Sequence, residues 1–221
     1  GGPATYSKTL VNGILDMGIL ARVVRFSSVR WLPKVLRHTA YAWQVCLQSR
    51  YADAIYAQDP VSVGFPSAIA AMVTRKKLIL KIVGDYAWEQ GVQRFGVLEL
   101  LDDFLKRSYG RSVELLRAIE HFTARHAVHI IVPSRYLKSV VIQWGIPEEK
   151  ITVIANSFEI PSHTILREDA KMMLGLHGRV AISAGRLVKW KGFGVLISVV
   201  ADLIKKNIPL SFVIIGSGPL E

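Results

Sequence analysis

The sequence predicts an α/β protein built on parallel sheets with helices on both faces. Two observations predict it. Helical patterns and short apolar, β-branched runs alternate along almost the whole chain. The apolar runs, such as 78-LILKIVG-84 and 127-AVHIIVPS-134, are nearly continuous, as expected for strands buried on both faces. With 51% hydrophobic and 20% charged residues, the chain also has ample apolar material for a packed core.

The first series of predicted elements ends at residue 156. Helical spacing of apolar residues predicts helices, and short β-branched runs predict strands. Residues 86–107 are rich in aromatic and charged side chains and are expected to be irregular. In chain order we expect a helix at 5–18, a strand at 22–27, a basic helix at 34–50, a strand at 53–58, a helix at 61–75, a strand at 78–84, a helix at 108–126, a strand at 127–134, a helix at 135–144 and a strand at 151–156.

A second series follows Pro161, which interrupts the pattern within 156–164. We expect a first domain at 1–157, with its first strand missing, and the start of a second, truncated domain at 158–221. The chain begins with Gly1 and ends on a strand followed by a glycine turn, which favours a fragment of a longer product. The elements expected in the second series are a helix at 167–174, a strand at 179–185, a helix at 192–206 and a strand at 210–215.

The charge is strongly basic and unevenly distributed. The net charge is +11, and residues 17–52 contain no acidic side chain. In that stretch Arg30, Lys34 and Arg37 are interleaved with aromatic residues, a composition that attracts anionic surfaces. We predict peripheral contact with an anionic membrane. The alternative is that the helix at 34–50 only covers the sheet. Nucleic acid is a weaker candidate, because no nucleic-acid module accompanies the charge.

The location predicted is cytoplasmic, on the inner face of a membrane. The apolar runs are far shorter than the ~18 residues that suggest a spanning helix. The single cysteine, Cys46, cannot form an intramolecular disulfide, which fits a reducing compartment. The six histidines show no zinc spacing, so no metal is expected.

The strongest functional pattern is 182-ISAGRLVKWKGFGVLI-197, a buried strand followed by a basic turn and a helix. Ligands of such folds bind outside the carboxyl ends of the strands. Arg186 and Lys191 would lie there beside a helix N-terminus, as a site for a diphosphate. A solvated basic turn is the alternative, and Lys189 is expected at the surface.

Two glycine motifs accompany this pattern. The strand in 212-FVIIGSGPLE-221 ends in Gly216 and Gly218, which let the backbone approach a ligand closely, and Pro219 can begin a helix. Gly1 and Gly2 precede the first helix, where main-chain N–H groups can hold a phosphate. Taken alone, that second motif is more often an ordinary turn.

In order along the chain, the Gly-Gly pair, 131-IVPSRYLKSVV-141, 151-ITVIANSFE-159, the Arg186–Lys191 turn and the Gly216–Pro219 turn resemble the retaining glycosyltransferases of family 4. The resemblance implies the GT-B fold, two Rossmann-like domains facing a cleft. It implies transfer of a hexose from a nucleotide diphosphate sugar to a hydroxyl of a lipid-linked or polysaccharide acceptor, without a cofactor. Arg186 and Lys191 would hold the donor diphosphate, with Gly1, Gly2, Gly216, Gly218 and Pro219 near the donor.

The sequence departs from the family in several places. The acidic pair with which family members bind the donor sugar does not occur up to Glu221. We therefore expect these 221 residues by themselves to have no transferase activity and to act as a non-catalytic binding module. Where many members have a histidine, this chain has 84-GDYAWE-89. Asp85 there is a candidate catalytic and acceptor-binding residue, or it only caps a turn. Tyr86, Trp88 and Asn156 are the other acceptor-side candidates. A sugar-nucleotide epimerase of the same fold is the alternative activity.

Overall fold

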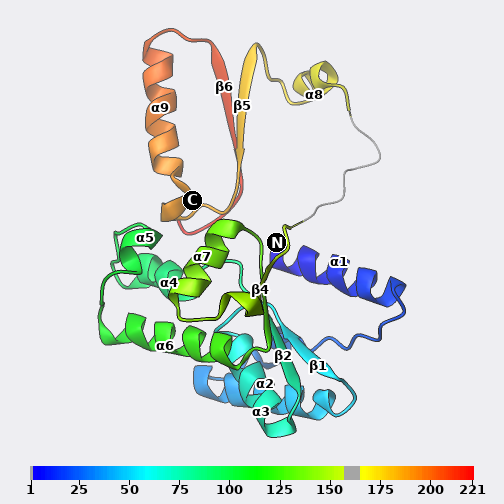
Figure 1. Cartoon of the computed structure of the whole chain (residues 1–221). Coiled ribbons are helices and arrows are strands. Elements are labelled where there is room, and N and C mark those ends of the chain that lie inside the picture. Colours follow the sequence, from blue (N-terminus) through cyan, green and yellow to red (C-terminus); the bar gives the residue numbers. More distant parts are fainter. Residues whose placement is uncertain (1, 157–164) are drawn as a thin grey trace. The chain divides into compact units, whose positions relative to one another are not determined.

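The computed structural model describes residues 2–156 and 165–221, and the chain divides into two compact units (Figure 1). Unit 1 consists of Gly1–Gln90 and Glu99–Asn156, and unit 2 consists of Gly91–Leu98 and Ser157–Glu221. The sheet of unit 1 has four strands and a separate sheet in unit 2 has two, and every strand pair is parallel. The predicted α/β class is therefore confirmed.

The sheet of unit 1 follows the order of the chain. Neighbouring strands pair in register, with Ile55 opposite Leu78 and Leu80 opposite Ile130. Each of these side chains is at most 9% exposed, because helices cover the sheet. α3 contacts the first two strands and α7 contacts the last two. The strands, in sheet order, are β1 (Ala54–Ala57), β2 (Lys77–Lys81), β3 (His129–Val132) and β4 (Ile151–Val153).

The helices of this part of the chain alternate with the strands as expected from the pattern. α2 packs on α3, and α3 packs on α6, so that three helices form one continuous layer. The helices are α1 (Gly2–Asp16), α2 (Lys34–Ser49), α3 (Gly64–Thr74), α4 (Tyr86–Arg94), α5 (Leu101–Phe104), α6 (Arg111–His126) and α7 (Arg135–Gln143), with the 3₁₀ turns η1 (Phe26–Val29) and η2 (Glu148–Lys150).

The strand predicted at 22–27 is wrong. This segment pairs with no strand of the described residues and runs into η1. Its alternation is nevertheless real, because Val24 and Phe26 pack on the core while Val23 and Arg25 are exposed. The Val24 carbonyl accepts a hydrogen bond from the Tyr41 hydroxyl of α2, at 3.2 Å. The alternation of apolar and polar residues indicates that one side of the segment is buried. Here a helix, rather than a sheet, covers that side.

The expectation that 86–107 is irregular is wrong in part, because the segment contains α4 and α5. Asp85 precedes α4, and its Oδ1 accepts a hydrogen bond from the Trp88 N–H at 2.7 Å. An aspartate in this position is a strong helix start signal. Glu89 in the first turn and Arg94 in the last turn also match the helix dipole. These three residues could have predicted the helix.

Unit 2 repeats the alternation of helix and strand on a smaller scale. β5 pairs with β6 over six residues in parallel, from Arg179 opposite Leu210 to Ala184 opposite Ile215. α9 packs on β6, and the side chains of Phe193 at its start and of Val188 before η3 are buried. The elements are α8 (Arg167–Met173), β5 (Arg179–Ala184), the 3₁₀ turn η3 (Lys189–Lys191), α9 (Phe193–Lys205) and β6 (Leu210–Ile215).

Candidate active site

The basic turn of unit 2 lies at the carboxyl end of β5, as predicted. Arg186 follows directly after Gly185, and Lys191 ends η3 just before α9. Both side chains are exposed. Gly192 is the N-cap residue of α9, with a φ of 71°, and provides no side-chain hydrogen bond to the first N–H groups of this 13-residue helix. Two cations and a helix N-terminus thus meet at one sheet edge, which suits an anion.

The glycines of the second turn make a close contact within the protein, and their predicted place near the donor stays a prediction. A Cβ atom on Gly216 would collide with the Gly185 carbonyl, and one on Gly218 would collide with the backbone of Leu187. The two turns are also joined by backbone hydrogen bonds, from Leu187 N to Ser217 O at 3.0 Å and from Leu220 N to Leu187 O at 3.2 Å. The glycines therefore allow the two turns to pack backbone on backbone. Pro219 is exposed in the same turn.

In unit 1 the candidate Asp85 is almost completely buried, with 2% of its surface exposed. Its carboxylate accepts the Trp88 N–H and so caps α4. This contact agrees with the alternative interpretation of the sequence, in which Asp85 caps a turn. Burial raises the pKa of the Asp85 carboxyl, and the Trp88 N–H and the Arg117 guanidinium oppose that rise. A catalytic role for Asp85 stays a prediction.

Tyr86 and Trp88 lie in the same turn as Asp85. The Tyr86 N–H donates to Oε2 of Glu120 at 3.0 Å, and the Trp88 indole N–H donates to the Glu99 carbonyl at 2.9 Å. Glu120, in the middle of α6, is completely buried. Sequence reasoning missed it, because a glutamate in a helix is normally expected at the surface.

The carboxyl end of β2 carries a second residue that the sequence reading missed, Lys81. Its side chain is 1% exposed. Its ammonium donates to Oδ1 of Asn156 at 2.8 Å and lies 3.6 Å from the centre of the Tyr6 ring. Within the described residues no carboxylate forms an ion pair with Lys81. Lys81 thus joins β2 both to α1 and to Asn156, an acceptor-side candidate.

α1 lies against the carboxyl end of the sheet of unit 1. The Tyr6 and Tyr56 hydroxyls are 3.3 Å apart, and the Ser7 hydroxyl donates to Oε1 of Gln58 at 2.6 Å. Gly2 is the first residue of the helix, whereas Gly1 and residues 157–159 lie outside the described residues. The helix that follows the Gly-Gly motif is therefore located at the sheet edge where ligands of such folds bind.

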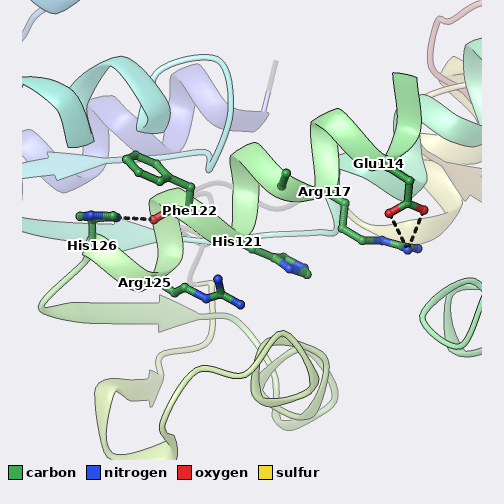
Figure 2. Close-up of a pocket in the computed structure, with 7 residues that line it drawn as sticks. Glu114, Arg117, His121, Phe122, Arg125 and His126 are labelled. Atoms are coloured by element: carbon green, nitrogen blue, oxygen red, sulfur yellow. Dashed lines mark hydrogen bonds and ion pairs between the residues drawn. The ribbon is translucent and has the colours of Figure 1, made fainter. Parts of the chain in front are cut away.

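A pocket of about 500 Å³ lies along one side of α6 (Figure 2). Arg117 pairs with Glu114 at 3.0 Å there, and the tilted rings of Phe122 and His126 have their centres 4.1 Å apart. Burial and the nearby arginines lower the pKa of His121 to about 4, so its ring is neutral at pH 7. None of the predicted site residues lines this pocket. Its lining consists of Glu114, Arg117, Ala118, His121, Phe122, Arg125 and His126.

The structure therefore brings the predicted residues together in groups within each unit. In unit 2 it gathers Arg186 and Lys191 at one sheet edge with the glycine turn at 216–219. In unit 1 it places Asp85, Tyr86 and Trp88 in one turn after β2, while Asn156 meets the end of β2 through Lys81.

Solved structures similar to this chain show its fold. It is similar to Anabaena Alr3699/HepE in complex with UDP, with 21% sequence identity, a TM-score of 0.58 and coverage of 85% of this chain and 46% of that one. The UDP-glucose complex of the same protein gives 21% identity and a TM-score of 0.59, with coverage of 80% and 43%. The chain thus spans less than half of the Anabaena chain. The likeness confirms the predicted GT-B-type fold with Rossmann-like domains.

The family follows from the sequence match. Residues 1–157 match the glycosyl transferase 4-like domain, and the chain belongs to this family. A putative UDP-N-acetylglucosamine 2-epimerase from Listeria monocytogenes is more distant, with 12% identity, a TM-score of 0.48 and coverage of 84% of this chain and 46% of that one. No curated protein matches the chain.

Proposed function

We propose that the whole protein transfers a hexose from a nucleotide diphosphate sugar to a hydroxyl group of a lipid-linked or polysaccharide acceptor, with retention of configuration. The observation that carries this proposal is the exposed pair Arg186 and Lys191 at the carboxyl end of β5, in a chain of the glycosyl transferase 4-like family. The complexes of Anabaena Alr3699/HepE with UDP and UDP-glucose support a nucleotide sugar as donor.

Arg186 and Lys191 have a defined chemical task in this proposal. As the bond between sugar and diphosphate breaks, negative charge develops on the departing diphosphate while the sugar becomes oxocarbenium-like. Arg186 can hold two phosphate oxygens at once, and Lys191 adds a compact positive charge. The N-terminus of α9 contributes N–H groups at the same edge. In this proposal the nucleotide sugar is the co-substrate, and the reaction requires no cofactor.

Replacing Arg186 tests the proposal in the whole protein. Arg186→Ala should lower kcat roughly a hundred- to a thousandfold, because one stabilising donor is lost in the transition state. Arg186→Lys should recover only part of the rate, since lysine cannot hold two oxygens at once. Lys189→Ala is the matched control, because Lys189 is an exposed cation of the same turn. Equal turnover by Arg186→Ala and the parent would refute the role of Arg186.

Product analysis separates transfer from epimerisation. With a labelled donor, a transferase moves the label to the acceptor and forms a product with the donor's anomeric configuration. An epimerase changes the sugar of the donor even when no acceptor is present. Epimerisation of the donor sugar in the absence of any acceptor would therefore contradict the proposed transfer and support the epimerase alternative.

We also propose that the protein is cytoplasmic and attaches reversibly to an anionic membrane surface through α2 and the segment before it. α2 turns Tyr41 and Val45 to the core, whereas the side chains of Leu36, Trp43 and Leu47 share an outer face and are 55%, 65% and 37% exposed. Trp31 next to it is 80% exposed. Aromatic residues with nearby arginines suit a membrane interface. Among the residues that the structure describes, no helix is long and apolar enough to cross a membrane.

A further inference from the structure

Two buried carboxyl side chains, Asp85 and Glu120, meet beneath the β2–α4 turn, which we define as residues 82–88. Asp85 is 2% exposed and Glu120 is 0% exposed. Asp85 precedes α4, whereas Glu120 belongs to α6 and accepts the N–H groups of Tyr86 and Ala87, the two residues that follow Asp85. Two ionised carboxylates are strongly unfavourable in one dry site, because each has lost its water and each repels the other. One of the two carboxyl groups is therefore expected to hold a proton.

The hydrogen bonds of the pair show which carboxyl holds the proton. Oε2 of Glu120 accepts the N–H groups of Tyr86 at 3.0 Å and Ala87 at 3.4 Å. Its Oε1 is buried and receives no N–H or hydroxyl donor from the described residues. Asp85, in contrast, accepts the Trp88 N–H and lies near the Arg117 guanidinium, and both favour its ionised form. Glu120, rather than Asp85, is therefore the carboxyl group that these contacts favour in its protonated form, with the proton on Oε1.

Electrostatics agree with this geometry. Burial raises the pKa of Glu120 well above its ordinary value, and the negative charge of Asp85 raises it further. The other groups that face the pair are Arg117 of α6, the Trp144 side chain that follows α7, and Tyr136 of α7, whose own pKa is raised in part by Asp85. Arg117 is the cation of this set, and it acts on Asp85.

We propose that Glu120 is a neutral carboxylic acid in the folded protein, that it shares its proton with Asp85, and that this pair fixes the β2–α4 turn from the inside. Glu120 is a positioning residue, because it acts through the backbone of Tyr86 and Ala87 and through the carboxylate that caps α4. The pair joins the start of α4 to the middle of α6. The inference does not depend on the proposed function, although the turn carries the acceptor-side candidates Asp85, Tyr86 and Trp88.

The proposal has a defined consequence for stability against pH. Above pH 4.5, the ordinary pKa of a glutamate, the unfolded chain releases the Glu120 proton while the folded protein keeps it. Unfolding then releases a proton, so this residue makes the unfolding equilibrium constant rise by up to about tenfold per pH unit until the raised pKa is reached. The neighbouring His121 acts in the opposite direction between its folded pKa of about 4 and its ordinary 6.5. A comparison of variants therefore isolates Glu120.

Glu120→Gln is the central variant. Its amide oxygen can accept the Tyr86 and Ala87 N–H groups and its amide N–H can donate to Asp85, but it cannot release a proton. In the parent, loss of the Glu120 proton on unfolding should raise the unfolding equilibrium constant by up to about tenfold per pH unit between pH 5 and 8. Urea unfolding of Glu120→Gln over the same range should lack this contribution. Glu149→Gln, which removes an exposed carboxyl, should keep the parent's dependence. The same pH dependence in Glu120→Gln and the parent would overturn the proposal.

Infrared spectroscopy gives an independent readout that does not rely on reversible unfolding. At pH 7 the folded parent and Glu149→Gln should show the carbonyl stretch of a protonated carboxylic acid, and Glu120→Gln should not. A parent protein without such a band at pH 7, or a band that survives in Glu120→Gln, would contradict a neutral Glu120.

Discussion

At the residue scale, unit 1 contains a buried cation whose partners are unusual. The Lys81 ammonium has an amide oxygen and an aromatic ring as its partners, and it has no carboxylate partner in residues 2–156 or 165–221. A buried charge loses its hydration, and contact with an aromatic face stabilises a desolvated cation by about 2 kcal/mol. Lys81 is therefore held by α1 and Asn156 together, and it connects two segments far apart in the sequence.

Substitution of Lys81 tests this role. Lys81→Ala should lower the free energy of unfolding by about 2–4 kcal/mol, because it leaves a cavity and removes the contact with Tyr6. Lys81→Met should cost less, because it fills the volume without burying a charge. Lys77→Ala, at an exposed position of the same strand, should stay within about 0.5 kcal/mol of the parent. Urea unfolding measures all three, and equal losses in the alanine and methionine variants would show that the volume filled by the side chain contributes nothing.

At the element scale, the two turns at the carboxyl edge of the unit 2 sheet behave as one structure. β5 and β6 end side by side, with Ala184 opposite Ile215, and the turns that follow continue the contact through backbone hydrogen bonds. The close approach at Gly216 and Gly218 makes this continuation possible. The location of Arg186 thus depends on residues 30 positions later in the chain, since the turn at 216–220 holds the turn at 185–187.

Gly218→Ala tests this dependence. Its Cβ would meet the Leu187 backbone, so the variant should weaken the pairing of the two turns and speed hydrogen exchange at the N–H groups of Gly185 and Leu187. Gly194→Ala is the control, because its Cβ meets nothing within 4 Å and alanine favours a helix by about 0.5–1 kcal/mol. If exchange at Gly185 and Leu187 is unchanged in Gly218→Ala, the two turns do not depend on each other.

At the scale of the whole molecule, the positive charge is concentrated in the first domain predicted from the sequence. Residues 1–157 contain 20 basic and 12 acidic side chains, whereas 158–221 contain 8 and 5. Of the three cations predicted to contact a membrane, Arg30 is exposed and Arg37 is half-buried, while the side chain of Lys34 lies outside the described residues. The exposed Trp31 and Trp43 supply apolar surface in the same segment.

Vesicle co-sedimentation tests the proposed membrane contact. The whole protein should bind vesicles that contain anionic lipid and dissociate at high salt, since each nearby cation contributes roughly 1 kcal/mol. Reversing the charges of Arg30, Lys34 and Arg37 should abolish binding, and Arg30→Glu with Trp43→Ser should weaken it without changing the half-buried Arg37. Arg111→Glu, a charge reversal at the exposed start of α6, is the control. Equal binding by all variants would contradict membrane contact through α2 and the segment before it.

The sequence by itself determined the α/β class, most of the strands and the basic turn at 186–191. These features depend on local patterns: β2 and β5 are apolar runs, and the motif at 185–192 is contiguous. The helix α4 was also within reach of the sequence, because Asp85, Glu89 and Arg94 mark its ends. The role of Arg186 and the position of the domain boundary remain predictions.

Only the tertiary structure decided what happens to the charged residues and to segments that need a distant partner. Lys81 and Glu120 are charged residues inside predicted elements, and only the packing of α1 and α4 over them shows that they are buried. Residues 22–27 alternate like a strand, yet a strand also needs a neighbour with free N–H and C=O groups, and here α2 covers the apolar side instead. Burial and pairing depend on contacts between residues far apart in the chain, and a local pattern does not contain them.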